Sequence, residues 1–258
     1  MTFQDFKFKE NLQKAIDEAG FKEPSPIQID AIPHILLGKD IVGQAHTGTG
    51  KTAAFGLPVL NQLTGKNAEA VVIVPTRELA MQVSDELFKF GKFLGINTAT
   101  VYGGQSYSRQ LKLIETASVI VATPGRFLDL LKNEHIKIKP KFVILDEADE
   151  MLDMGFLDDI KDIFTYLPED RQTLLFSATM PTAIKNLAKT ILKEPEFVTI
   201  TKSDVTNKNI TQTFYVVDER ERDDALIRLF DYKNPKKSII FCRTKKDVDR
   251  LSTFLLSQ

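Results

Sequence analysis

Short apolar runs alternate with amphipathic segments along most of this chain. The runs at 70–74 and 142–145 are apolar at almost every position, which is typical of strands covered by helices on both faces. Between such runs, segments such as 77–94 and 184–192 place apolar residues at helical spacing. This alternation predicts an α/β domain with a mostly parallel sheet flanked by helices. The seven strand candidates are residues 40–42, 70–74, 98–102, 119–122, 142–145, 173–176 and 197–200.

The hydrophobic pattern stops in a polar stretch after residue 200 and then starts again. We expect a first domain at 1–204, a linker at 205–209 and a second α/β unit at 210–258. The second unit is too short for a complete domain of this class, so we expect only its opening part. Its predicted elements are strands at 211–217 and 238–242 and helices at 219–232 and 244–256.

Composition narrows the classes of function. Of 258 residues, 34 are Lys or Arg and 35 are Asp or Glu, so any binding of a polyanion such as nucleic acid must come from a local basic surface. No apolar run approaches the ~20 residues of a membrane span, and the first residues do not resemble a signal peptide. We therefore expect a cytoplasmic protein. One cysteine, Cys242, lies in an apolar run and is expected to be a buried thiol, and three scattered histidines predict no zinc site.

The sharpest local motif is a glycine-rich loop between a strand and a helix. It consists of Ala45, His46, Thr47, Gly48, Thr49, Gly50, Lys51 and Thr52. Glycines let backbone N–H groups close around phosphate oxygens, and the helix that follows offers further donors. Lys51 would neutralise β/γ charge and Thr52 would ligate Mg²⁺. Although Ala45 replaces the usual first glycine, the strand before and the helix after favour a phosphate loop over an ordinary helix-capping turn.

A second cluster of chemistry follows the strand at 142–145. Asp146, Glu147, Ala148 and Asp149, called the acidic tetrad below, come directly after this strand, at the point where open α/β sheets place their ligands. Asp146 would hold Mg²⁺, largely through water, and Glu147 would orient or deprotonate the attacking water. Taken alone, such an acidic run is most often a solvated surface. Its pairing with a phosphate loop favours a nucleotide site.

These two motifs and five other blocks, in order, closely resemble the DEAD-box ATP-dependent RNA helicases over almost the whole chain. The resemblance implies a RecA-like P-loop NTPase domain, followed at 238–244 by the first motif of a second RecA-like domain. It also implies ATP and Mg²⁺ as cofactors and RNA as partner. The seven blocks are residues 20–28, 45–52, 75–80, 103–104, 123–126, 146–149 and 177–179.

The block at 20–28 resembles the adenine-reading motif of that family. By resemblance, Phe3, Phe21, Lys22, Pro26 and Gln28 would bind the base. Phe21 can stack on it, and the Gln28 amide can make two hydrogen bonds with the N6/N7 edge of adenine. The alternative is that this segment only caps the helix that it opens.

Three blocks at predicted strand ends would line a groove for one RNA strand. The resemblance implies contacts with phosphates and 2′-hydroxyls instead of bases, so binding would tolerate any sequence. For an isolated arginine, a salt bridge or a helix cap is the alternative. The residues are Pro75, Thr76, Arg77, Gly103, Gly104, Thr123, Pro124, Gly125 and Arg126.

The block at 177–179 would link the state of the bound nucleotide to the affinity for RNA. By resemblance, Ser177 and Thr179 hydrogen-bond to the acidic tetrad, and we assign Asp149 as their partner. A plain N-cap of the next helix explains the hydroxyls equally well.

The implied function is coupling of ATP binding and hydrolysis to RNA binding and local duplex unwinding. The printed sequence holds no Arg-Gly-x-Asp or His-Arg-x-Gly-Arg block, so we expect very slow turnover by this chain alone. Two alternatives stay open: an ATP-gated RNA clamp or adaptor without turnover, and a DNA translocase on the same fold.

Overall fold

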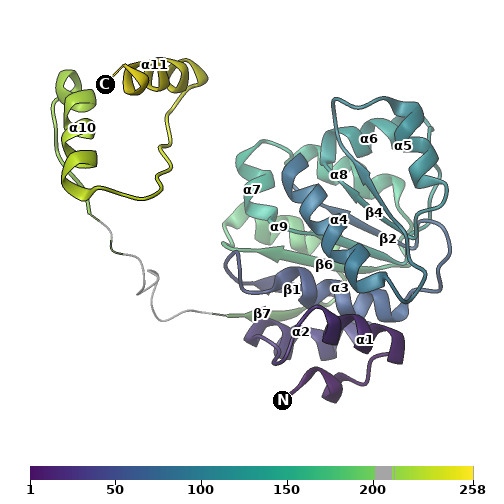
Figure 1. Ribbon diagram of the computed structural model, residues 1–258. Helices are drawn as coiled ribbons and strands as arrows, with labels where there is room; N and C mark the ends of the chain where they lie inside the picture. The colour runs from purple at the N-terminus through teal and green to yellow at the C-terminus, as the bar shows by residue number, and fades with distance from the viewer. Residues whose placement is uncertain (201–210, 212, 258) are drawn as a thin grey trace. The chain divides into compact units, whose positions relative to one another are not determined.

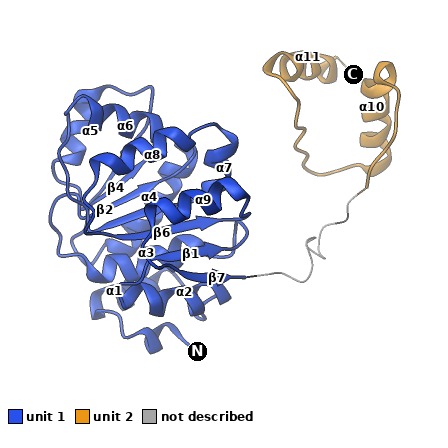
Figure 2. Ribbon diagram, turned by 180° about the vertical axis from the view of Figure 1, so that it is seen from behind, with its two compact units in different colours: residues 1–201 blue, residues 202–258 orange. Residues whose placement is uncertain are grey.

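The computed structural model describes residues 1–200, 211 and 213–257 and divides the chain into two compact units, Met1–Thr201 and Lys202–Gln258 (Figure 2). The first unit contains all seven strands described (Figure 1). Its elements are η1 Phe3–Phe6, α1 Glu10–Glu18, α2 Pro26–Leu36, β1 Ile41–Gln44, α3 Lys51–Gln62, β2 Ala70–Ile73, α4 Arg77–Gly91, β3 Thr98–Val101, α5 Tyr107–Ile114, β4 Val119–Ala122, α6 Pro124–Lys132, β5 Phe142–Leu145, α7 Ala148–Asp153, α8 Leu157–Tyr166, β6 Gln172–Ser177, α9 Thr182–Ile191 and β7 Glu196–Thr199.

The seven strands form one parallel sheet in the order β3-β4-β2-β5-β6-β1-β7. All seven predicted strands are present, and their ends differ from the predicted ones by no more than two residues. The protein is therefore an α/β protein with a parallel sheet flanked by helices, as its hydrophobic pattern predicts. Because all strands run the same way, the loops that follow them meet at the C-terminal ends of the strands, called the carboxyl edge below. The loops that precede the strands meet at the opposite ends, called the amino edge.

Two hydrophobic cores sandwich the sheet. One joins η1 and α1–α4 to one face of the sheet, and the other joins α5–α9 to the opposite face. Neighbouring strand residues alternate between the two, since Val72 belongs to the first core while Val71 and Ile73 belong to the second. Burial on both faces explains why β2, β4 and β5 are apolar throughout.

The second unit contains η2 Glu219–Glu221, α10 Arg222–Lys233 and α11 Lys245–Leu256. Both predicted helices are confirmed, and the Thr244 hydroxyl caps α11 by accepting the Asp247 N–H. The predicted strands at 211–217 and 238–242 are wrong for the described residues: no ladder hydrogen bonds join them, and Val216 and Phe241 are each 91% exposed. A strand needs a neighbour to complete its hydrogen bonds, and apolar composition alone does not supply one. Cys242 is only half-buried there.

The predicted linker at 205–209 lies outside the described residues, so the domain limits expected from the sequence stay a prediction. Among the helices that are described, none is both long and apolar enough to cross a membrane.

Candidate functional site

The phosphate loop connects β1 to α3 at the carboxyl edge of the sheet. Ala45, directly after β1, is still hydrogen-bonded to β6, because its N–H donates to the Ser177 carbonyl at 3.1 Å, while residues 46–48 are exposed. The Thr49 hydroxyl closes the loop on the His46 carbonyl at 2.7 Å. Gly50 has φ +90°, and a Cβ there would lie 2.4 Å from the Gln28 amide nitrogen. Only glycine fits this point, because both the backbone conformation and the close approach exclude a side chain.

Lys51 of this loop contacts the acidic tetrad, which follows β5. Its Nζ lies 2.7 Å from Glu147 Oε2, with both side chains at most 10% exposed. The Thr47 hydroxyl donates to the other oxygen of Glu147 at 3.1 Å. Glu147 itself has φ +55°, an uncommon conformation for a residue with a side chain. The fold therefore brings together the lysine and the carboxylate that the sequence placed about 100 residues apart.

Asp146 is buried beside this pair. One of its carboxylate oxygens accepts the Glu147 N–H at 3.1 Å. Burial raises the pKa of Asp146 to about 7, while Lys51 acts to lower it and Glu147 to raise it. The charge of Lys51 is thus shared between two carboxylates. A cation bound here would favour the ionised form of Asp146.

Thr52, in the first turn of α3, lies beside a carboxylate that the sequence analysis missed. Burial raises the pKa of Glu86, against the opposing effects of a hydrogen bond with Thr52 and the charge of Lys89. Glu86 lies on α4, is partly buried, and stands three residues after the buried Val83 and four before the buried Phe90. Helical spacing thus places it beside the apolar face, but nothing in the local sequence connects it with Thr52.

The adenine block lies against the phosphate loop, but several of its groups are already occupied. Gln28 is 3% exposed, its amide donates to the Gly50 carbonyl at 3.0 Å, and its Oε1 accepts the Ser25 N–H at 2.9 Å. Gln28 therefore makes the helix-capping contact and also touches the phosphate loop, and its role toward adenine stays a prediction. Pro26 is exposed at the first position of α2.

Phe3 and Phe21 pack edge to face with ring centroids 5.8 Å apart, and Phe3 is 2% exposed. Burial of Phe3 leaves the half-buried Phe21 and the exposed Lys22 as the more accessible members of this group. A cavity of about 390 Å³ beside them is lined by Phe3, Phe21 and Lys22, among others, but not by Gln28.

Asp149 and the 177–179 block are joined by hydrogen bonds at the end of β6. One Asp149 oxygen accepts both the N–H and the hydroxyl of Thr179 at 2.8 Å, and the Asp149 N–H donates to the Ser177 hydroxyl at 3.1 Å. Partial burial raises the pKa of Asp149, but hydrogen bonds with Ser177, Thr179 and Ala178 outweigh this and lower it. The N-cap of α9 is Pro181, so these hydroxyls serve the tetrad and not the helix.

The predicted RNA-binding residues follow β2, β3 and β4 at the same edge. Thr76 caps α4 by accepting the Leu79 N–H at 3.2 Å, and Thr123 and Pro124 open α6. The exposed backbone comes from Gly103, Gly104 and Gly125, whereas Pro75 and Pro124 are buried. Thr76 and the two prolines therefore shape the loops that present the glycines.

The two arginines of this group differ in their surroundings. Arg77 is exposed and lies over the Tyr102 ring, 4.9 Å from its centroid. Arg126 lies over the Tyr107 ring at 4.3 Å and hydrogen-bonds to Gln105 and Gln110. The sequence reasoning missed both tyrosines and Gln110. Gln110 carried a signal, because it lies one turn before Ile114 on the buried face of α5.

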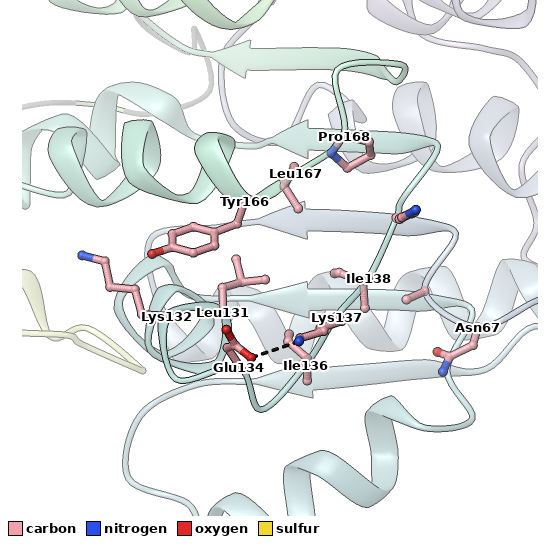
Figure 3. Close-up of a pocket in the computed structure, with 12 residues that line it drawn as sticks. Asn67, Leu131, Lys132, Glu134, Ile136, Lys137, Ile138, Tyr166, Leu167 and Pro168 are labelled. Atoms are coloured by element: carbon pink, nitrogen blue, oxygen red, sulfur yellow. Dashed lines mark ion pairs between the residues drawn. The ribbon is translucent and has the colours of Figure 1, made fainter.

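A different cavity, of about 850 Å³, lies at the amino edge of the sheet (Figure 3). It is lined by residues that precede β2, β5 and β6, including Ala68, Ile138 and Leu167, and by Lys137, which pairs with Glu134. None of the predicted site residues lines it.

Comparison with known proteins bears on this arrangement. The profile of the DEAD/DEAH box helicase family matches residues 25–187. Among curated proteins, the chain is 57% identical over 260 residues to the DEAD-box ATP-dependent RNA helicase RhpA of Helicobacter pylori. The aligned region covers 100% of this chain and 53% of RhpA. It is 47% identical to the DEAD-box ATP-dependent RNA helicase CshA of Bacillus subtilis, covering 99% of this chain and 52% of CshA.

Solved structures give the same picture. A DEAD box protein from the hyperthermophile Methanococcus jannaschii matches with a TM-score of 0.76 and 38% identity over 100% of this chain and 70% of that one. The chain spans about half the length of the curated relatives that it matches. The chain belongs to the DEAD/DEAH box helicase family.

Proposed function

We propose that this chain forms the ATP-binding part of a DEAD-box RNA helicase, in which ATP binding and hydrolysis are coupled to RNA backbone binding and local duplex unwinding. The observation that carries the proposal is the buried contact of Lys51 with Glu147 beside Asp146, at the edge where parallel sheets bind ligands. Phosphoryl transfer to water needs a cation on the phosphates and a group that orients the attacking water, and this contact brings a candidate for each to the same point.

The roles of the individual groups follow from their contacts. A γ-phosphate entering the loop would compete with Glu147 for Lys51, because both are anions that can pair with its ammonium group. Glu147, released from that pair, could then accept a hydrogen bond from the attacking water. The exposed backbone at residues 46–48 would supply N–H donors to the phosphates.

The residues present fit Mg²⁺ as well. Mg²⁺ takes one or two carboxylates together with phosphate oxygens and water, and Asp146 and the Thr52 hydroxyl offer such a donor set. Across the described residues there is no group of three or more His, Cys, Asp or Glu side chains that could hold a metal by itself, so the nucleotide would complete the site. When bound, Mg²⁺ would neutralise charge on the β- and γ-phosphates.

RNA would bind on the neighbouring loops that follow β2, β3 and β4. Exposed glycine backbone and Arg77 suit phosphates and 2′-hydroxyls, so we expect binding with little sequence preference. Asp149 links the tetrad to residues 177–179 and is proposed to couple the two ligands. The cytoplasmic location expected from the sequence also stays a prediction.

The test is phosphate release from ATP by this chain, with and without single-stranded RNA, beside thermal unfolding with ATP or GTP and Mg²⁺. Glu147→Gln is the catalytic variant, and Glu150→Gln, on the exposed face of α7, is its matched control. We expect ATP to raise the unfolding temperature more than GTP in all three proteins. Slow phosphate release should rise with RNA and fall about 10²–10⁴-fold in Glu147→Gln alone.

Three results would contradict the proposal. Equal stabilisation by ATP and GTP would remove the adenine selection, and stimulation by DNA equal to that by RNA would favour a translocase on DNA. ATP-dependent RNA binding without any phosphate release, at equal levels in the unmodified chain and in Glu147→Gln, would indicate a clamp without turnover.

A further inference from the structure

Arg126 is largely enclosed by its own protein. Its side chain is 12% exposed, and Nη1 donates to both the Gln105 carbonyl and Gln110 Oε1 at 3.0 Å. The Tyr107 ring covers one face of the guanidinium with its centroid 4.3 Å away. Nε lies 3.9 Å from an Asp129 carboxylate oxygen. Little of this guanidinium is left to neutralise the charge of a ligand.

Gln110 extends the same contact network to the other side of the glycine pair. It is 0% exposed, and its Nε2 donates to the Tyr102 carbonyl at 2.7 Å while its Oε1 accepts from Arg126. Gln110 therefore holds the residue before Gly103, and Arg126 holds the residue after Gly104. Together they fix both ends of the loop at 102–105.

Arg77 differs from Arg126 on each of these points. It is exposed, and no side-chain hydrogen bond or ion pair of Arg77 occurs among the described residues. A Cβ built on Gly104 would lie 3.6 Å from Arg77 Nη1, so the guanidinium lies next to the open glycine backbone. Gly104 has φ +89°, a conformation that glycine adopts freely, so the contacts at the two ends of the loop are what restrict its backbone.

We propose that Arg126 and Gln110 are positioning residues that hold the Gly103–Gly104 backbone in the shape that binds RNA phosphate, and that Arg77 supplies the charge. This inference rests on the proposed RNA binding. It separates two arginines that occupy equivalent places in the sequence motifs. It also assigns a role to Gln110, which the motifs do not include.

The salt dependence of RNA binding distinguishes the two roles. On single strands, each phosphate neutralised by a protein cation contributes about 0.7 to the slope of log affinity against log salt. Removing a cation that touches phosphate lowers this slope, whereas distorting the loop weakens binding and leaves the slope nearly unchanged. A role limited to general stability would change the unfolding temperature and neither binding quantity.

The experiment measures binding of the 258-residue chain to a fluorescein-labelled oligouridylate of about ten nucleotides by anisotropy, between about 50 and 200 mM salt. The variants are Arg77→Gln, Arg126→Gln, Arg126→Lys, Gln110→Leu and the double variant Arg126→Gln/Gln110→Leu. Lys137→Gln, at the amino edge, is the control, and thermal unfolding is recorded for every protein.

We expect Arg77→Gln to lower the slope by about 0.7. Arg126→Gln should weaken binding about tenfold at an unchanged slope, and Gln110→Leu should do the same. Because the two residues contact each other and hold the same loop, the double variant should lose less affinity than the sum of the two single losses. Arg126→Lys keeps the charge but cannot reproduce the paired contacts, so it should bind as weakly as Arg126→Gln.

Opposite results would overturn the proposal. A slope lowered by Arg126→Gln as much as by Arg77→Gln, or full affinity in Arg126→Lys, would place Arg126 on a phosphate. If Arg126→Gln fails to fold, Arg126→Lys and Gln110→Leu still decide between the two roles. An unmodified chain that does not bind RNA would refute the proposed function and this inference together, whereas normal binding with the wrong slopes would refute the inference alone.

Discussion

The two edges of the sheet both carry charge, but they use it differently. At the amino edge, the Glu69 carboxylate accepts hydrogen bonds from the Thr64 hydroxyl, the Thr64 and Lys66 N–H groups and the Lys141 ammonium, all at 2.8 to 3.0 Å. At the carboxyl edge, one ammonium, that of Lys51, lies among the carboxylates of Asp146 and Glu147. At the amino edge, one carboxylate has hydrogen-bond donors on both of its oxygens, whereas at the carboxyl edge two carboxylates share one ammonium group.

The pKa values express the same difference. Burial acts to raise the pKa of Glu69, but hydrogen bonds with Lys141, Thr64 and Lys66 outweigh it and lower the pKa to about 2. For Asp146, burial outweighs the lowering effects of Lys51 and of the Glu147 N–H, and its pKa rises to about 7. A carboxylate with a depressed pKa stabilises the fold, whereas one with a raised pKa is stabilised by a ligand that brings positive charge.

The largest expected effect is that of Lys51→Met on ATP binding. The variant removes the ammonium that would pair with the phosphates and leaves Glu147 without its partner, so affinity for ATP should fall about a hundredfold or more. Titration calorimetry with ATP and Mg²⁺ measures it. Lys66→Met, an exposed lysine at the amino edge, should bind ATP normally, and equal affinity in the two variants would remove the difference between the edges.

A smaller effect is expected for Asp149→Ala. This variant breaks the hydrogen bonds to Thr179 and removes the link between the tetrad and the end of β6. ATP affinity should change little, while the stimulation of phosphate release by RNA should fall about tenfold. Asp153→Ala, an exposed position on the same short helix, is the matched control. Stimulation that is unchanged in Asp149→Ala would refute the coupling role.

The smallest effect on ligands is expected at Glu69, although its effect on stability is not small. Glu69→Gln should bind ATP and RNA normally but lose about 1.5–3 kcal/mol of unfolding free energy at neutral pH, because hydrogen bonds to a charged group are lost. Urea denaturation measures this loss. A weaker affinity for ATP in this variant would mean that the amino edge contributes to the site.

The pH dependence of that loss has a definite sign. The folded pKa of Glu69, about 2, lies below the ordinary value of 4.5, so its contribution is complete above pH 4.5 and disappears as pH falls toward 2. The difference in stability between the unmodified chain and Glu69→Gln should therefore shrink over that window. A difference that grows on acidification would contradict the assigned cause.

The parts predicted well from the sequence are those that local pattern determines. Strands such as β4 and β5 were found at their observed bounds because burial on both faces leaves an uninterrupted apolar run. The phosphate loop and the tetrad were identified because their chemistry lies within a few consecutive residues. The strands expected at 211–217 and 238–242 were wrong because a strand depends on a neighbour that local pattern does not specify.

The details of the site depended on contacts between distant segments. The sequence treated Arg77 and Arg126 alike, since each follows a strand and a proline, and only folding shows that Gln110 and Tyr107 enclose the second. Similarly, the burial of Phe3 follows from its packing on Phe21, and spacing along the chain does not reveal it. Motifs therefore indicated the candidate site, and tertiary contacts distinguished its exposed residues from the residues that support them.

The most direct test of the difference between the edges is hydrogen–deuterium exchange of the chain with and without ATP and Mg²⁺. We predict slower exchange at 45–52 and 146–149, the carboxyl-edge segments that would contact nucleotide, and unchanged exchange at 64–69 and 136–141. Protection of the amino-edge segments at saturating nucleotide, with the phosphate loop unchanged, would contradict the account.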